Sequence, residues 1–143
     1  MSGERWVFGV ASVLFVFGCA SSTAGVSVEQ ARSASPRGAK VYERECSGCH
    51  GDDGGGLSGT PRVMGAGALP LRGASGKLGP LRSAKDVFDY VSSEMPLPKA
   101  RVGSLPEADY WAVVEFMLRG AGKDVPAEGL SAATASSIVV NAP

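Results

Sequence analysis

The chain has 143 residues, which is the size of one ordinary domain. Its 14 Lys and Arg residues balance its 14 Asp and Glu residues, so the formal net charge is zero. Proteins that bind nucleic acid usually carry a strongly basic surface, and this balance argues against that class of function. The 20 glycines, many of them shortly after residue 50, predict a small core with long loops.

An apolar run from residue 6 to residue 17 dominates the start of the chain. It is too short for a membrane span of about 20 residues, and it has the length of a signal-peptide core. The residues at the end of this run and just after it, Val16 to Ala20, resemble the lipobox of bacterial lipoproteins. We therefore expect residues 1–18 to be a lipoprotein-type signal peptide and Cys19 to carry acyl chains that hold the exported protein on the periplasmic side of a bacterial membrane. Cleavage by an ordinary signal peptidase and an uncleaved anchor stay open as alternatives.

The next segment, residues 19–34, is small and polar and has no sustained apolar period. This composition predicts a flexible tether behind the lipid. A helix is then expected to begin at Ser35, as the N-cap, with Pro36 in the first helical position. It would run towards Cys46.

The strongest motif is Cys46-Ser47-Gly48-Cys49-His50, the spacing of a c-type haem attachment site. Each Cys sulfur can form a thioether bond with one vinyl group of the porphyrin, and the imidazole that follows can ligate the iron. His50 is the only histidine of the chain. The motif therefore predicts one covalent haem c, whose apolar ring would complete a small core. A structural zinc site, which needs about four ligands, and a redox dithiol fit the motif less well.

The helix before the motif carries two further signals. Gly38 and Tyr42 lie eight and four positions before the first motif cysteine, on the same helix face. This arrangement resembles the first helix of class I cytochromes c, where a Gly and an aromatic residue meet the last helix. The resemblance covers roughly residues 35–120. It implies an all-α, cytochrome c-like fold with three to five helices wrapped around one haem, formed by residues 35–122, with residues 123–143 as a C-terminal extension.

A glycine-rich loop, residues 51–61, follows the motif, and glycine permits close approach of the backbone to a flat ring. Its end resembles the family's loop in which a proline carbonyl accepts a hydrogen bond from the ligating histidine. The resemblance assigns that role to Pro61, which would orient His50. Residues 62–81 contain many Gly and Pro residues, and we expect them to form irregular structure that covers a haem edge. Two arginines are candidates for pairing with the haem propionates, Arg72 and Arg82.

A second helix is expected to begin with Ser83 as N-cap and to end at Met95, because Pro96 disfavours helical backbone in the residue before it. A Met-Pro pair after a helix resembles the distal ligand loop of small bacterial class I cytochromes c. The resemblance implies that Met95 is the second axial ligand. Met64 stays open as the alternative ligand, because the chain between it and the motif has sufficient reach. Met117 lies within a periodic helix and is expected in the core.

The last helix is predicted from a capping-box pattern formed by Ser104 and Glu107 and is expected to end near Gly120. Its apolar positions recur at the spacing of one helix face. The remainder, residues 123–143, is compatible with extended chain along the body and with disorder. The apolar face of the predicted last helix comprises Tyr110, Val113, Val114, Met117 and Leu118.

Occupation of both axial positions, by His50 and Met95, would leave no open position at the iron for a substrate. The sequence therefore favours an electron-transfer protein over an enzyme, one that exchanges single electrons with redox partners and serves, for example, as the cytochrome subunit of a dehydrogenase or oxidase system. The alternatives are a haem sensor or peroxidase-like protein with a labile distal ligand, and a lipoprotein whose motif binds zinc.

Charge is unevenly distributed between residues 62 and 101, where basic residues outnumber acidic ones. Because this segment is expected to frame the haem, a basic surface there could steer an acidic redox partner. A merely solvated surface explains the same residues equally well. The basic residues are Arg62, Arg72, Lys77, Arg82, Lys85, Lys99 and Arg101.

Overall fold

The structure, a computed structural model, describes residues 27–57, 60, 62–64 and 81–141. Over these residues it is helical, with no strand beyond an isolated bridge between Ser83 and Val139, so the all-α prediction is confirmed. Among them, no helix has the length and apolar character needed to cross a membrane. The elements are α1 (Val28–Ala34), α2 (Pro36–Glu45), α3 (Ser47–His50), α4 (Ala84–Glu94), the 3₁₀ helix η1 (Lys99–Arg101), α5 (Glu107–Gly120) and the 3₁₀ helix η2 (Ala135–Ser137).

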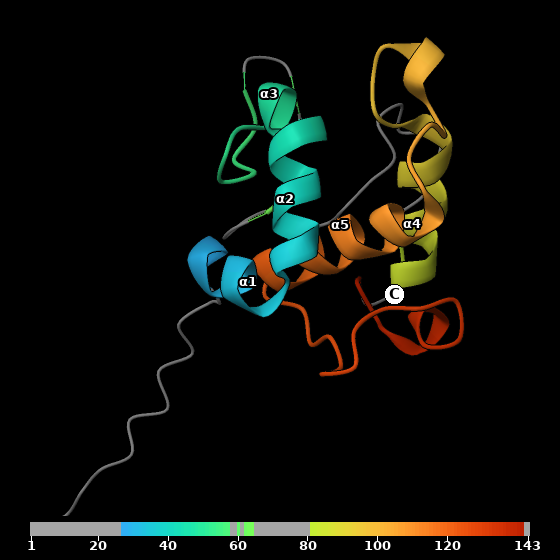
Figure 1. Cartoon of the computed structure of the whole chain (residues 1–143). Coiled ribbons are helices and arrows are strands. Elements are labelled where there is room, and N and C mark those ends of the chain that lie inside the picture. Colours follow the sequence, from blue (N-terminus) through green and yellow to red (C-terminus); the bar gives the residue numbers. More distant parts are fainter. Residues whose placement is uncertain (1–26, 58–59, 61, 65–80, 142–143) are drawn as a thin grey trace, which may run out of the picture.

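The helices form two columns joined by α5 (Figure 1). One column is α2 with α3 at its end, and the other is α4 with η1 at its end. Helix α5 lies across the bases of both columns, and α1 lies beside the base of the first. The two columns thus point the same way and place α3 and η1 at the same end of the molecule.

Helix α2 crosses α5 at Gly38. A Cβ atom built on Gly38 would lie 2.0 Å from the carbonyl oxygen of Ala112 and 2.8 Å from the Cβ of Phe116, so only glycine fits without displacing backbone. One turn later, the Tyr42 ring packs on Phe116 with ring centroids 5.4 Å apart. The predicted close approach of another helix at Gly38 is confirmed, and it fixes the position of the chain that leads into Cys46.

Helix α4 has the predicted ends. Ser83 Oγ accepts from the Asp86 N–H at 3.2 Å, and the Asp86 carboxylate accepts from the Ser83 N–H at 2.9 Å, which completes a capping box. The helix ends at Met95, whose backbone is extended. Its Phe88 ring stacks on Trp111 of α5 with centroids 3.6 Å apart, so α4 is held against the crossing helix.

Helix α5 begins later than its capping pattern predicted. The N-cap is Pro106, with extended backbone and no side-chain cap, and the helix starts at Glu107. The prediction of Ser104 as the cap is wrong because Pro106 would then stand at the second helical position and would force Leu105 out of helical backbone. The predicted end at Gly120 is confirmed.

The prediction of a tether over residues 19–34 is wrong for its last part, which forms helix α1 (Val28–Ala34). Ser27 Oγ accepts from the Gln30 N–H at 3.2 Å, and the Gln30 side chain accepts from the Ser27 N–H at 2.8 Å. Ala31 is fully buried against the remainder of the core. Small residues without a long apolar period suit a short helix that is stabilised by tertiary contact rather than by its own propensity.

The described part of the C-terminal extension, residues 123–141, packs back on the start of α4 at its end. The Val140 N–H donates to the Arg82 carbonyl at 2.7 Å, and the Asn141 side chain donates to the Leu81 carbonyl at 2.6 Å. Val140 is buried, whereas its neighbour Val139 points outward. The extended-chain alternative therefore describes this end of the tail.

Candidate functional site

The attachment motif folds as a single helical turn at the end of the first column. Cys46 ends α2 and begins α3, and its carbonyl accepts from the N–H groups of Cys49 at 3.1 Å and His50 at 2.9 Å. Gly51 ends the turn with a φ of 78°, a backbone conformation that residues with a Cβ rarely adopt. Both thiols and the imidazole therefore project from one turn of α3.

Tyr42 ties this turn to the core. Its hydroxyl donates to the Gly51 carbonyl at 3.0 Å in a buried hydrogen bond. Burial raises the pKa of Tyr42 above its usual value, with further contributions from Cys46 and Asp53, so the phenol stays protonated and remains a donor. The aromatic residue predicted for the first helix thus has two roles, packing on α5 and holding the residue that follows His50.

The loop after the motif is bound back onto the motif's carbonyls. The Gly56 N–H donates to the His50 carbonyl at 2.8 Å, and the Thr60 hydroxyl donates to the Cys49 carbonyl at 2.5 Å. Arg32 of α1 donates to the Asp52 carbonyl at 2.9 Å. The loop is therefore fixed from both the motif and α1.

Several predicted positions lie outside the described residues. They are the proposed hydrogen-bond acceptor for His50, the proposed lipidation site and two basic residues of the predicted haem-framing segment. In the same order, these positions are Pro61, Cys19, and the pair Arg72 and Lys77.

The motif thiols differ in environment. Both are free, Cys46 is half-buried and Cys49 is exposed. Burial, with a smaller contribution from the neighbouring Glu45 carboxylate, raises the pKa of Cys46 to about 12. A redox-active thiol pair instead depends on a thiolate of lowered pKa, so this environment disfavours the redox dithiol interpretation.

A zinc site is also disfavoured by geometry. Within the described part of the chain, no three His, Cys, Asp or Glu side chains come together as a metal-ion cluster. A structural zinc ion needs about four such ligands. The donor set of α3, two free thiols and one imidazole on one turn, instead fits a covalently bound haem with a histidine ligand.

Met95 lies in the second column, at the end of α4. It is half-buried and packs against the core cluster. Its carbonyl accepts from the Tyr110 hydroxyl at 2.9 Å and from the Gly103 N–H at 3.4 Å. Tyr110, predicted only as a core residue, thus also anchors the backbone of the candidate ligand from α5.

The other two methionines are held in the core. Met64 is fully buried, and its side chain fills a slot between Gly54 and Gly120, where added Cβ atoms would lie 2.7 Å from Met64 atoms. Met117 is buried on α5, as predicted. Met64 would have to leave this slot to ligate an iron beside α3, which favours Met95 over its rival.

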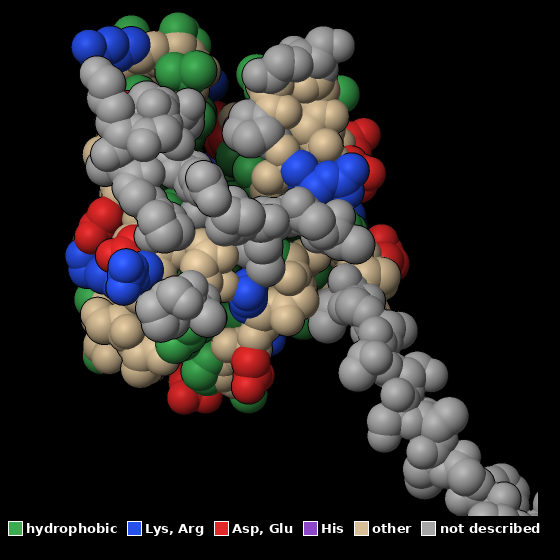
Figure 2. Space-filling model, turned by 180° about the vertical axis from the view of Figure 1, so that it is seen from behind, with side chains coloured by type: hydrophobic (Ala, Val, Ile, Leu, Met, Phe, Trp, Pro, Cys, Tyr) green, Lys and Arg blue, Asp and Glu red, His purple; other side chains and the backbone are tan. Residues whose placement is uncertain are grey.

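The two columns are separated by a hollow at their upper ends (Figure 2). One wall is the end of α2 with α3, and the other is the end of α4 with η1. An ion pair joins them, because Glu45 of α2 accepts from the Arg101 guanidinium of η1. The structure therefore brings the attachment motif and the Met95 segment to the same end of the fold, although they are far apart in sequence.

Some of the basic residues predicted to frame the site are paired with carboxylates. Lys85 contacts Asp89 at 2.7 Å, and Arg101 contacts Glu45. Arg82 and Lys99 are exposed. Arg82 and Lys85 lie at the start of α4, at the opposite end of this column from η1, so of the described basic residues in the second column only Lys99 and Arg101 lie near the hollow.

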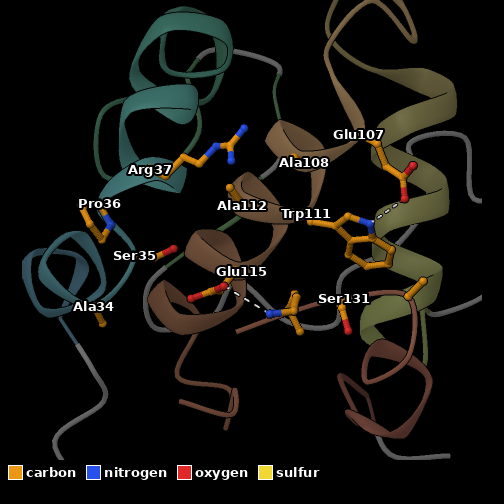
Figure 3. A pocket seen from close by; sticks show the side chains of 12 residues that line it. Ala34, Ser35, Pro36, Arg37, Glu107, Ala108, Trp111, Ala112, Glu115 and Ser131 are labelled. Atoms are coloured by element: carbon orange, nitrogen blue, oxygen red, sulfur yellow. Dashed lines mark hydrogen bonds between the residues drawn. The ribbon is translucent and has the colours of Figure 1, made fainter. Parts of the chain in front are cut away.

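A separate pocket of about 540 Å³ lies at the base of the first column (Figure 3). It is bounded by Arg37, by Trp111 and Glu115 of α5, and by the C-terminal extension at Leu130. The Leu130 N–H donates to Glu115 at 3.3 Å across it. None of its lining residues belongs to the attachment motif or to the Met95 segment, so it is not part of the haem site.

An all-α fold that presents Cys46, Cys49 and His50 on one turn defines a c-type cytochrome. The family model described as cytochrome c oxidase, cbb3-type, subunit III matches residues 33–117. The chain belongs to this family. It has no significant match among curated proteins or among solved structures. The family implies haem c and haem-based electron transfer, and cytochrome c domains are typically exported.

Proposed function

We propose that the protein is a monohaem electron carrier with haem c bound covalently through Cys46 and Cys49 and ligated axially by His50 and Met95. It exchanges single electrons with exported or membrane-bound redox partners. An oxidase as one of these partners is compatible with the family description. The observation that carries the proposal is the placement of α3 and the Met95 segment on opposite sides of one hollow.

The bound haem would supply the one-electron redox change, and residues of the chain would hold its two axial ligands in position. Tyr42 holds the turn that bears His50, through Gly51. Tyr110 holds Met95 through its carbonyl. Tyr42 packs against α5 and Tyr110 belongs to it, so both candidate ligands are held by contacts with the same helix.

Electron transfer is favoured over catalysis because the only histidine is assigned to the iron and Met95 fills the opposite side. Thioether ligation also stabilises ferrous iron and raises the reduction potential. A sensor or peroxidase-like haem protein would need the sixth position to be open or readily vacated.

Visible spectroscopy of the purified full-length protein tests this proposal. Protein made in a host competent in cytochrome maturation is expected to show a low-spin reduced spectrum that carbon monoxide leaves unchanged, with the haem retained after denaturation because the thioether bonds are covalent. A ready spectral change with carbon monoxide would favour the sensor or peroxidase-like alternative, and colourless protein would exclude a haem role.

We further propose that Cys19 carries the lipid that holds the carrier at a bacterial membrane, based on the resemblance of residues 16–20 to a lipobox. Replacing Cys19 with alanine is expected to move the holoprotein from the membrane fraction to the soluble periplasmic fraction with its spectrum unchanged. Cell fractionation followed by haem staining measures this. Retention of Cys19→Ala in the membrane would show that another part of the chain is the anchor.

A further inference from the structure

Glu45 is a half-buried carboxylate at the junction of the two columns. It is the last residue of α2, directly before Cys46, and its side chain is only 7% exposed. It accepts from Arg44 at 2.6 Å on its own helix and from Arg101 of η1 on the other side of the hollow. Arg101 therefore links the segment after Met95 to the helix that carries the attachment motif.

Glu45 differs from an ordinary surface carboxylate because two guanidinium groups donate to it, from Arg44 and from Arg101. Exposed pairs contribute roughly 0–1 kcal/mol, because water screens the charges. Hydrogen bonds between two charged groups are stronger than those between neutral groups, and removing Arg101 would leave Glu45 with one charged partner instead of two. Hydrogen bonds from Arg44 and Arg101 hold the pKa of Glu45 below its usual value despite the opposing effect of burial.

The Glu45 end of the pair is fixed in the frame of the molecule. Arg44 also lies 3.6 Å from Asp109 of α5, and Asp109 pairs with Arg37 at 2.8 Å. These contacts tie α2 to α5 beside the tight crossing at Gly38. Glu45 therefore has a rigid support, and the mobile partner in any opening motion would be the segment that carries Arg101.

The Arg101 end belongs to a segment with few attachments of its own. Among the described contacts, Met95 is held through its carbonyl by Tyr110 and Gly103, and the chain then turns through η1. Pro96 is buried, but Leu97 is 61% exposed and residues 98–101 are also exposed, so the turn beyond Pro96 has little apolar burial to hold it. The ion pair joins this turn to the first column, at the end of α2.

We propose that the Glu45–Arg101 ion pair is a clamp that holds residues 95–103 against the attachment motif and thereby keeps Met95 at the haem iron. The inference rests on the proposed His50 and Met95 ligation. Glu45 and Arg101 are positioning residues, because they act through Met95 and not by contact with the iron.

Competition by imidazole at the ferric iron of the holoprotein tests the clamp. Glu45→Gln and Arg101→Gln are each expected to raise the apparent affinity for imidazole about tenfold. This corresponds to a change of about 1.4 kcal/mol in the free energy of the competition between imidazole and Met95. The double variant is expected to match the single variants, because both remove the same contact. Additive effects, or no effect, would overturn the clamp.

Two matched variants separate the clamp from general effects of charge and stability. Lys99→Gln removes the same charge from η1 and leaves the Glu45–Arg101 pair in place. Lys85→Gln breaks an ion pair outside the network, the one between Lys85 and Asp89 within α4. Both are expected to leave the imidazole affinity unchanged, and an increase equal to that of Glu45→Gln would count against the proposal.

A second measurement distinguishes failure of the clamp from failure of the ligand assignment. Amide hydrogen exchange in residues 97–104 is expected to accelerate several-fold in Glu45→Gln and not in Lys85→Gln. In a Met95→Ala background, Glu45→Gln is expected to have no further effect on imidazole affinity. If Met95→Ala raises the affinity and Glu45→Gln changes neither readout, only the clamp fails; if Met95→Ala has no effect, the ligand assignment fails and the clamp's proposed consequence fails with it.

Discussion

Replacing Met95 with alanine is expected to open the iron to carbon monoxide and to lower the reduction potential by on the order of 100 mV, since axial ligands set haem potentials over a range of about 0.8 V. The physical reason is the loss of the thioether, which favours the ferrous state. Alanine has no donor atom to replace it. Redox titration and the reduced spectrum with and without carbon monoxide measure the two effects.

The rival ligand provides the matched control for this experiment. Met64→Leu keeps the volume of a fully buried side chain in the slot between Gly54 and Gly120, so it is expected to cost less than about 1.5 kcal/mol of stability. It is expected to leave the potential and the carbon monoxide response unchanged. The reverse pattern, with Met64→Leu opening the iron and Met95→Ala inert, would assign the sixth position to Met64.

The substitution Gly38→Ala is expected to lower the free energy of unfolding by on the order of 3 kcal/mol, at the upper end of typical overpacking costs. The added methyl group would lie 2.0 Å from the Ala112 carbonyl oxygen, and neither partner is a flexible side chain that could turn away. The two helices must therefore separate, which also loosens the contact between Tyr42 and Phe116. Urea unfolding of the holoprotein, followed by circular dichroism, measures the loss as a lower midpoint.

Gly48 provides the control, because it is also a helical glycine close to the haem site. A Cβ on Gly48 meets no atom within 4 Å. Gly48→Ala is therefore expected to be neutral or to stabilise by up to about 1 kcal/mol through helix propensity. Equal destabilisation by the two substitutions would show that close packing at Gly38 is not what joins α2 to α5.

The segment from Met95 to Arg101 shows how function and stability are divided in this fold. Helix α4 is held firmly, by a capping box at Ser83 and by stacking of Phe88 on Trp111. The turn after it depends on individual polar contacts, from Tyr110 and from Glu45. The proposed sixth ligand therefore lies where a rigid helix meets a more weakly held turn, and the polar contacts decide how firmly it stays in place.

The sequence by itself determined the features that depend on short spacing. Two cysteines and a histidine within one turn predict haem attachment because the chemistry needs neighbouring groups and nothing else. The start of α2 follows from the preference of proline for the first helical position, although the Ser35 side chain makes no capping hydrogen bond. Both ends of α4 follow from its capping box and from the effect of Pro96 on the residue before it. The same local effect, at Pro106, explains why the cap predicted at Ser104 does not form.

Only the tertiary structure decided the features that depend on residues distant in sequence. Helix α1 has a local start signal in the Ser27–Gln30 capping box but no long apolar face, and it gains stability from contacts such as that of Arg32 with the Phe116 ring, 5.9 Å away. Nothing in the sequence around Glu45 or Arg101 links the two residues, because each resembles an ordinary surface charge until the columns are placed side by side. Local spacing encodes where a haem can bind, whereas the long-range contacts between columns decide which side chain faces it and how firmly that side chain is held.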